Sequence, residues 1–205
     1  MQNRNSNSIW DWDIVKLVVV TALLSIGLNF GIRGFHEESV RAVIAWTARV
    51  DVLLFCMAFG GTAFHQWAKN AFSFWLMMNR KYWGISFAIL HLIHLLSLLI
   101  LQQFFHPVFT LAANFALFAG GTAYVFVILM LLTSFNAFAK LLSKANWKRL
   151  HWLGGHWIWV VFMSSYWKRV FRGEYGFLIL GLLLIFVMGL RLRQLYLSRS
   201  LNKTT

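Results

Sequence analysis

Long apolar runs, separated by short polar gaps, dominate the hydropathy pattern of the 205-residue chain. A helix needs about 20 apolar residues to cross the hydrocarbon core of a bilayer. Six segments come near that length, and we expect each to form a transmembrane helix: 14–32, 48–67, 82–105, 108–132, 147–167 and 175–192. The gaps between them leave no room for a separate soluble domain. The pattern therefore predicts an all-α integral membrane protein, in which residues 1–205 form one six-helix bundle.

The basic residues divide unevenly between the two ends of this expected bundle. Cytoplasmic loops and tails carry the excess of lysine and arginine in membrane proteins. One end holds four of the six acidic residues and six of the 19 basic residues, namely Arg33, Arg41, Arg49, Lys168, Arg169 and Arg172. The remaining 13 basic residues (19 minus 6) lie at the end that holds both termini. We therefore expect both termini to be cytoplasmic.

The composition agrees with a lipid bilayer environment, since 60% of the residues are hydrophobic and only 12% are charged. The net charge of +13 does not indicate a nucleic-acid partner, because such a surface needs clustered basic residues that face water. Cys56 is the only cysteine, so this chain alone forms neither a disulfide nor a cysteine-ligated metal site. No strand–glycine–helix motif is present, and we expect no flavin or nicotinamide site in this chain.

Four histidines lie within two expected helices that run in the same direction. His91 and His94 are one turn apart on one face, whereas His151 and His156 are about 140° apart around their helix. Ionisable side chains inside a membrane are costly and face a partner, a cavity or a cofactor. Two imidazoles from facing helices suit bis-histidine haem ligation, whereas zinc needs more ligands. The alternative is a haem-free bundle, a scaffold or small transporter, whose histidines form interhelical hydrogen bonds.

Three glycine pairs occur in three different expected helices, at 60–61, 120–121 and 154–155. Small residues let transmembrane helices approach closely, so each pair predicts tight helix packing. Three pairs in one bundle also suit a fold that makes room for a flat ligand.

Three stretches resemble ferric-reductase-like transmembrane domains. NRKYWGISFAILHLIH (79–94) is similar to their basic-pair, glycine and Leu-His pattern, and LTSFNAFAKLLSKANWKRLHWLGG (132–155) is similar to their Trp-x-x-Leu-His signature. WTARVD (46–51) resembles the Thr-x-Arg opening of their second helix. The likeness covers most of residues 40–195. The size and helix number resemble the haem-binding membrane subunit of the periplasmic methionine-sulfoxide reductase system, the MsrQ or YedZ type.

The resemblance implies a b-type haem protein of the bacterial inner membrane, the electron-transfer subunit of an oxidoreductase system. Electrons would come from a quinol or a separate reductase and pass to a redox partner on the periplasmic side or to ferric iron. Ligand roles pass to His91 and His151, and His94 and His156 are additional imidazoles. This chain has Ser164 where the subtype has a histidine, which favours one haem over two.

Charged side chains near the expected haem edges suggest partners for its propionates. Arg80, Lys81, Lys148 and Arg149 would serve on the cytoplasmic side, and Arg49 on the outer side. The alternative is that each anchors its helix at the membrane interface.

Overall fold

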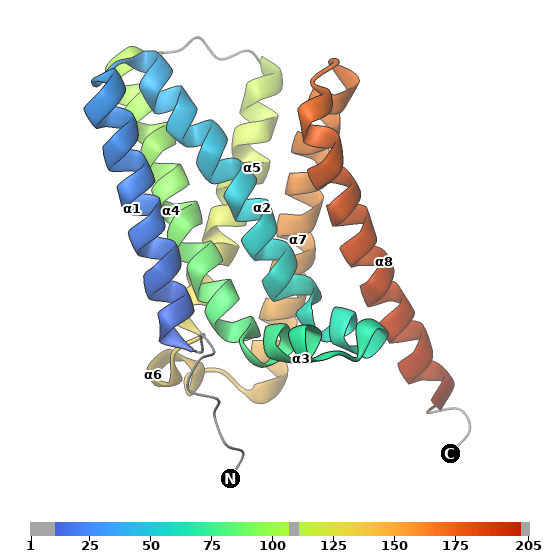
Figure 1. The fold of residues 1–205 in the computed structure, drawn as a ribbon. Helices are drawn as coiled ribbons and strands as arrows, with labels where there is room; N and C mark the ends of the chain where they lie inside the picture. Colours follow the sequence, from blue (N-terminus) through green and yellow to red (C-terminus); the bar gives the residue numbers. More distant parts are fainter. Residues whose placement is uncertain (1–10, 107–110, 202–205) are drawn as a thin grey trace.

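The computed structural model describes residues 11–106 and 111–201, and within these ranges it contains helices and no strands. Six of these helices are long, and Figure 1 shows that they run alternately in opposite directions. They are α1 (Trp12–Arg33), α2 (Glu37–Ala68), α4 (Arg80–Phe105), α5 (Leu111–Leu132), α7 (Lys144–Phe171) and α8 (Leu178–Leu201). The short elements α3 (Ala71–Met78), α6 (Asn136–Ala139) and η1 (Tyr175–Phe177) join some of them. The predicted all-α fold is confirmed.

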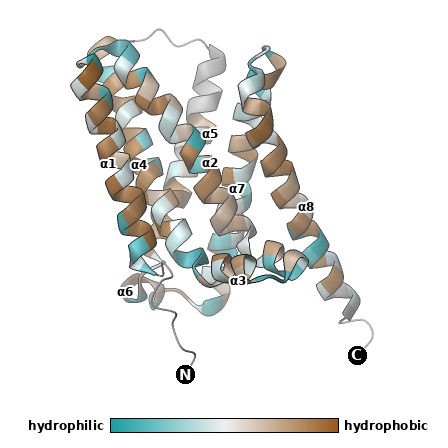
Figure 2. Cartoon of the chain, viewed as in Figure 1, coloured by the Kyte–Doolittle hydropathy of each residue, from teal (hydrophilic) through white to brown (hydrophobic). Residues whose placement is uncertain are grey.

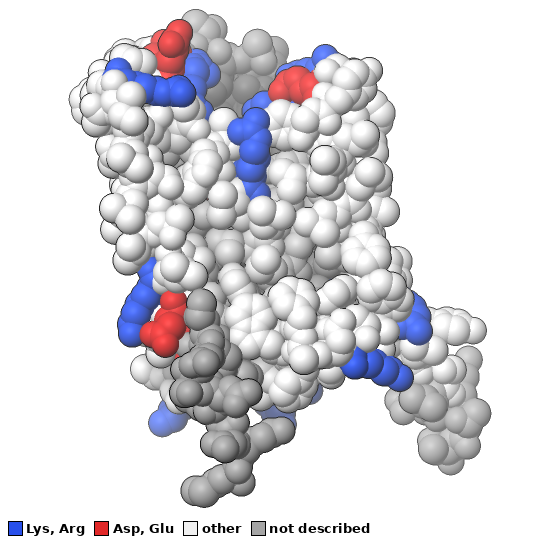
Figure 3. Space-filling model, viewed as in Figure 1, with Lys and Arg blue, Asp and Glu red and all other residues white. Residues whose placement is uncertain are grey.

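Both short helices lie at the same end of the bundle, together with the start of α1 and the end of α8 (Figure 1). This end is called the α3–α6 end below. Figure 2 shows hydrophobic residues along most of the coloured parts of the long helices. Figure 3 shows one face, on which the charged side chains gather toward the two ends with a largely uncharged band between them.

Four segments are long and apolar enough to cross a membrane: Trp12–Arg33, Glu37–Ala68, Arg80–Phe105 and Tyr175–Ser198. Helix α5 is apolar throughout the part whose side chains the structure describes, Phe118–Leu132. Helix α7 is long enough, but its centre is less apolar because it carries two histidines and several tryptophans. The structure thus indicates a multi-pass membrane protein with four clearly apolar spans.

The second long helix begins 11 residues earlier than its apolar run predicts, at Glu37 instead of residue 48. His36 caps this helix, since its Nδ1 accepts a hydrogen bond from the Ser39 backbone N–H at 3.3 Å. Glu37 and Glu38 in the first turn also suit the positive end of the helix dipole. The expected loop before residue 48 is therefore wrong, because capping and charge extend the helix beyond the apolar segment.

The other boundaries differ less. Helix α7 begins at Lys144, three residues before the prediction, because the Ser143 side chain caps the Asn146 backbone N–H at 3.2 Å. The last apolar segment starts as η1 and continues as α8 to Leu201. The predicted start of the fourth segment, 108–110, lies outside the described residues.

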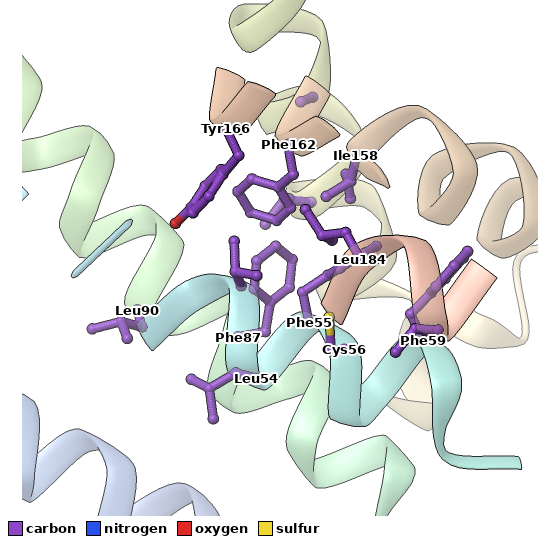
Figure 4. Close-up of a cluster of buried hydrophobic side chains, with 14 of the residues drawn as sticks. Leu54, Phe55, Cys56, Phe59, Phe87, Leu90, Ile158, Phe162, Tyr166 and Leu184 are labelled. Atoms are coloured by element: carbon purple, nitrogen blue, oxygen red, sulfur yellow. The ribbon is translucent and has the colours of Figure 1, made fainter. Parts of the chain in front are cut away.

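Aromatic side chains from three helices form the centre of the core (Figure 4). The rings of Phe55 and Phe59 on α2 stack at a centroid distance of 4.9 Å. Phe55 also contacts Phe87 on α4 at 5.5 Å and Phe162 on α7 at 5.4 Å. These contacts tie α2, α4 and α7 together near the middle of the bundle.

Two of the three glycine pairs lie at close helix contacts. A methyl group on Gly60 would lie 2.6 Å from Cγ1 of Val187 on α8, and one on Gly154 would lie 2.5 Å from Sδ of Met130 on α5. Around Gly120 and Gly121, by contrast, no described atom lies within 4 Å of the added methyl position. The packing role predicted for glycine pairs therefore holds for 60–61 and 154–155.

We expect Gly60→Ala to lower the thermal unfolding temperature of the detergent-solubilised protein. Overpacking against Val187 costs about 1–3 kcal/mol, more than the gain of about 1 kcal/mol from replacing a helical glycine by alanine. Gly27→Ala in α1 is the matched control, because its methyl group meets no described atom within 4 Å. An equal or higher unfolding temperature for Gly60→Ala would show that α2 and α8 are not closely packed at this point.

Candidate functional site

A cavity of about 560 Å³ lies toward the α3–α6 end. Its lining includes Phe59 from α2, Gly84 from α4, Met130 from α5, His151 from α7 and Arg191 from α8. The volume falls within the range of about 300–1,000 Å³ that is typical of sites for organic ligands. Five long helices thus enclose a space large enough for a ligand.

Aromatic rings form much of the cavity wall. Phe55, Phe59 and Phe87 line it from the side of the bundle core, where Figure 4 shows them clustered. Trp147 and Trp152 line it from the first turns of α7. Gly84 and Gly155 also belong to the lining and contribute no side chain to it. The wall therefore suits a flat, apolar body.

Four basic side chains also line the cavity: Arg80 and Lys81 at the start of α4, Lys148 at the start of α7 and Arg191 near the end of α8. No aspartate or glutamate belongs to the lining that the structure describes. The cavity thus combines an apolar wall with a surplus of positive charge.

His151 is the histidine that lines this cavity. Its ring stacks on Trp147 at 4.1 Å, and its Nε2 lies 3.1 Å from Oγ1 of Thr133. The Thr133 hydroxyl donates its proton to the Leu129 carbonyl at 2.7 Å, so it accepts from His151 Nε2–H. This arrangement leaves Nδ1 of His151 as the acceptor nitrogen.

His91 lies deeper, and it pairs with a buried carboxylate. Its Nδ1 is 2.8 Å from Oδ2 of Asp51 on α2, and both residues are buried. Since an ionised carboxylate only accepts, Nδ1 carries the proton and Nε2 is left as the acceptor. The other carboxylate oxygen, Asp51 Oδ1, is buried and has no hydrogen-bond partner among the described residues.

Aromatic and imidazole rings surround His91. Its ring stacks on Tyr124 from α5 at 4.5 Å and on Phe87 at 5.2 Å, and it meets Phe162 from α7 edge-on at 5.8 Å. His94 stacks on it at 5.7 Å, and Nδ1 of His94 lies 2.8 Å from Oγ1 of Thr47 on α2. The two histidines of α4 thus join α2 and α4 through two interhelical hydrogen bonds.

The structure does not bring His91 and His151 together. His91 lies level with Phe162, which is 11 residues after His151 on α7, a separation of about 16 Å along the helix axis. The cavity lining on α4 stops at Phe87 and Ala88, one turn before His91. Of the two expected axial ligands, the cavity therefore holds His151. The sharing of one haem by both remains a prediction that this arrangement does not favour.

The remaining predicted site residues lie outside the cavity lining. His156 bonds to the Trp152 carbonyl of its own helix through Nδ1 at 2.6 Å and contacts Phe59. Arg49 bonds to the Ala45 carbonyl and lies over the Phe177 ring, and Arg149 is not part of the lining. Among the predicted cationic partners, Arg80, Lys81 and Lys148 are the ones the cavity contains.

Sequence reasoning missed the roles of Asp51, Thr133 and Arg191. Asp51 lies well inside α2 and faces His91. Arg191 was expected only as a basic residue at one end of the bundle, yet it lines the cavity. The sequence does indicate that Asp51 has a partner, because an acidic residue lies within an apolar run. It does not indicate which residue is that partner, because the register between helices cannot be read from one segment.

Comparison of the chain with protein-family models, curated proteins and solved structures finds no match. Evidence for a function therefore comes from the chemistry of the cavity. Its residues fit a haem in three respects: apolar aromatic walls, one imidazole from α7, and cations for two propionates. They supply one histidine instead of the facing pair that the sequence predicts.

We expect Asp51→Ala to destabilise the solubilised protein by about 1–3 kcal/mol, because a buried imidazole N–H loses its acceptor. Asp51→Asn keeps an acceptor oxygen and should lose less. Asp13→Ala is the control, since its ion pair with Lys16 is mostly exposed and contributes less than about 1 kcal/mol. Denaturant unfolding followed by tryptophan fluorescence measures all three. Equal losses for Asp51→Ala and Asp13→Ala would contradict a structural role for the buried pair.

Proposed function

We propose that this chain is a membrane protein that binds haem b in the cavity at the α3–α6 end and carries electrons. The observation that carries the proposal is the cavity itself, about 560 Å³ with aromatic walls, one histidine and four basic side chains. Haem is a flat, apolar macrocycle with two carboxylates on one edge, and its iron binds imidazole. The resemblance of residues 79–94 and 132–155 to ferric-reductase-like domains supports the same conclusion.

Two lining residues have side chains that serve as axial ligands in haem proteins. His151 offers an imidazole, and Met130 offers a thioether sulfur. For ligation through Nε2, His151 has to give up its hydrogen bond to Thr133. His91 already has the arrangement typical of metal-bound histidine, with Nδ1–H donated to a carboxylate, but it lies one turn beyond the cavity lining.

The bound haem would supply one-electron transfer between ferric and ferrous iron. The residues of this chain hold it, exclude water from it through Phe55, Phe59 and Phe87, and offset the charge of its propionates. The sequence shows no nucleotide-binding motif, so the donor is a quinol or a separate reductase. The acceptor is a partner protein on the periplasmic side or ferric iron.

The proposal includes six transmembrane spans in a bacterial inner membrane, with the α3–α6 end in the cytoplasm. Two facts support this topology. The six long helices alternate in direction (Figure 1), and 13 of the 19 basic residues belong to the end where the termini lie. Helix α7 is then the span whose hydropathy alone does not mark it as membrane-crossing, because of its histidines and its basic ends.

A haem-free scaffold or small transporter is the second candidate, and one observation favours it. Each of the four histidines of α4 and α7 has a hydrogen-bond partner in the structure: Asp51 for His91, Thr47 for His94, Thr133 for His151 and the Trp152 carbonyl for His156. Three of these bonds join different segments of the fold, as a purely structural role requires.

The optical spectrum of the purified protein separates the two candidates. We expect a Soret band that shifts on reduction with dithionite, with haem and protein near a one-to-one ratio. His151→Ala should reduce the haem content several-fold or shift the band, because it removes the cavity imidazole. His156→Ala is the control and should leave the spectrum unchanged, because His156 does not line the cavity. A protein that neither retains nor takes up haem would favour the haem-free candidate.

Reporter fusions test the proposed topology. A reporter active only in the cytoplasm should give signal at the C-terminus and none when inserted at Gly34, in the turn between α1 and α2. The reasons are the excess of basic residues at the α3–α6 end and the location of this turn at the opposite end (Figure 1). The reverse pattern would place the cavity near the periplasm.

A further inference from the structure

We propose that Arg191 on α8 and Arg80 on α4 form a carboxylate-binding clamp, and that the cavity selects amphipathic organic anions through it. The inference deepens the proposed function and rests on it, since the anion considered is the propionate edge of a porphyrin. It assigns a specificity role to Arg191, which the sequence pattern marked only as one of many basic residues.

Arg191 is held in place with donor capacity to spare. Its Nη1 donates to the Phe59 carbonyl at 2.7 Å, and its guanidinium lies over the Phe59 ring at 4.0 Å from the centroid. Its Nε is buried and has no hydrogen-bond partner in the part of the chain that the structure describes. A guanidinium has five N–H donors. Arg191 is therefore a preorganised cation that lines a cavity with donors still available.

Arg80 provides the second side of the clamp. Its Nη1 donates to Oγ1 of Thr62 on α2 at 2.9 Å, and it lines the same cavity as Arg191. Arg80 and Arg191 thus bring two positive charges to one largely apolar space. Like charges beside an apolar space repel each other more strongly than in water. An anion bound between the two guanidinium groups would therefore offset their mutual repulsion.

Acidic side chains of the protein do not supply that anion within the described lining, which contains no aspartate or glutamate. Three of the carboxylates are engaged elsewhere: Asp13 with Lys16, Glu37 with Arg41, and Glu174 with Arg169. Asp51 is paired with His91. Within the described lining, a bound ligand can therefore supply a negative charge that the side chains there do not.

The position of the clamp defines the shape of the ligand. Arg80 lies in the first turn of α4, and the same lining continues along α4 to Gly84 and Ala88 and ends against Phe55 and Phe87. One edge of the cavity is therefore cationic and the opposite end is apolar. A ligand with carboxylates on one edge of a flat apolar body matches both parts, and planar guanidinium groups bind carboxylates in a bidentate manner.

The test compares two porphyrins that differ at their two propionate groups. These groups are charged carboxylates in haem b and neutral methyl esters in haem b dimethyl ester. Each is titrated into the full-length, haem-depleted protein in detergent, and binding is followed by quenching of tryptophan fluorescence, since Trp147 and Trp152 line the cavity. We expect haem b to bind at least about tenfold more tightly than its ester, or by about 1.4 kcal/mol, because the ester cannot form charge-assisted hydrogen bonds with the two guanidinium groups.

Single substitutions show which side chain produces the preference for the free acid over the ester. Arg191→Gln should reduce the preference for the free acid about tenfold with little change in affinity for the ester, and Arg191→Lys should restore part of it. Arg193→Gln is the matched control, because Arg193 lies on the same helix, is exposed and does not line the cavity. If Arg191→Gln fails to fold, two other measurements still test the clamp: the same titrations of Arg80→Gln, and the comparison of the two porphyrins on the unmodified protein.

The outcomes separate the clamp from the proposed function. Equal affinity of the unmodified protein for haem b and its ester would overturn the clamp and leave haem binding intact. Failure of both porphyrins to bind would overturn the clamp and haem binding together. An equal loss of preference in Arg193→Gln would also overturn the clamp, because it would trace the effect to the overall charge of α8.

Discussion

Polar side chains inside the apolar helices must find partners in neighbouring helices, and this constraint shapes the whole bundle. The hydrogen bond between Asp51 and His91 is its strictest case, since both side chains are almost fully buried. An unpaired carboxylate in such surroundings costs several kcal/mol, so the rotation of α2 against α4 is restricted to orientations that keep these groups in contact. The bond from His94 to Thr47, one turn away on each helix, fixes the same rotation.

The same constraint explains why the ligand cavity lies where it does. Around Asp51 and His91, aromatic rings from α4, α5 and α7 pack closely and enclose the polar pair. Toward the α3–α6 end the helices present Gly84 and Gly155 instead, and the cavity lies between them. Basic side chains reach this region from the helix ends, where lysine and arginine extend toward the interface. Aromatic packing thus encloses the polar pair in the middle of the bundle, and the cavity lies beyond it, toward one end.

The sequence predicted the helices better than it predicted their contacts. Apolar runs identify the long helices because membrane burial depends on local composition, whereas the start of α2 at Glu37 depends on a cap and on charge outside that run. The histidines of α4 and α7 could be chosen as candidate site residues because ionisable side chains within apolar segments imply a partner or a function, and the family resemblance singled out His91 and His151. The pairing of Asp51 with His91, 40 residues apart, depends on helix register and rotation, which no local pattern contains. The place of Arg191 in the cavity depends on the contact between α8 and α2 for the same reason.

The depth of the cavity constrains the path of electrons in the proposed function. His151 lies seven residues after the start of α7 and 20 before its end, or about 10 Å and 30 Å along the axis. A cofactor held there is near one membrane face, and the longer part of any path to the opposite face runs past His91. Phe162 contacts both His91 and Tyr166, and Tyr166 contacts Phe177 at 5.5 Å. Closely packed rings thus occupy the level where a histidine in place of Ser164 would serve a second haem in the related subtype. With one haem, the packing of these rings, and not the ligand cavity, would therefore control the slowest step across the membrane.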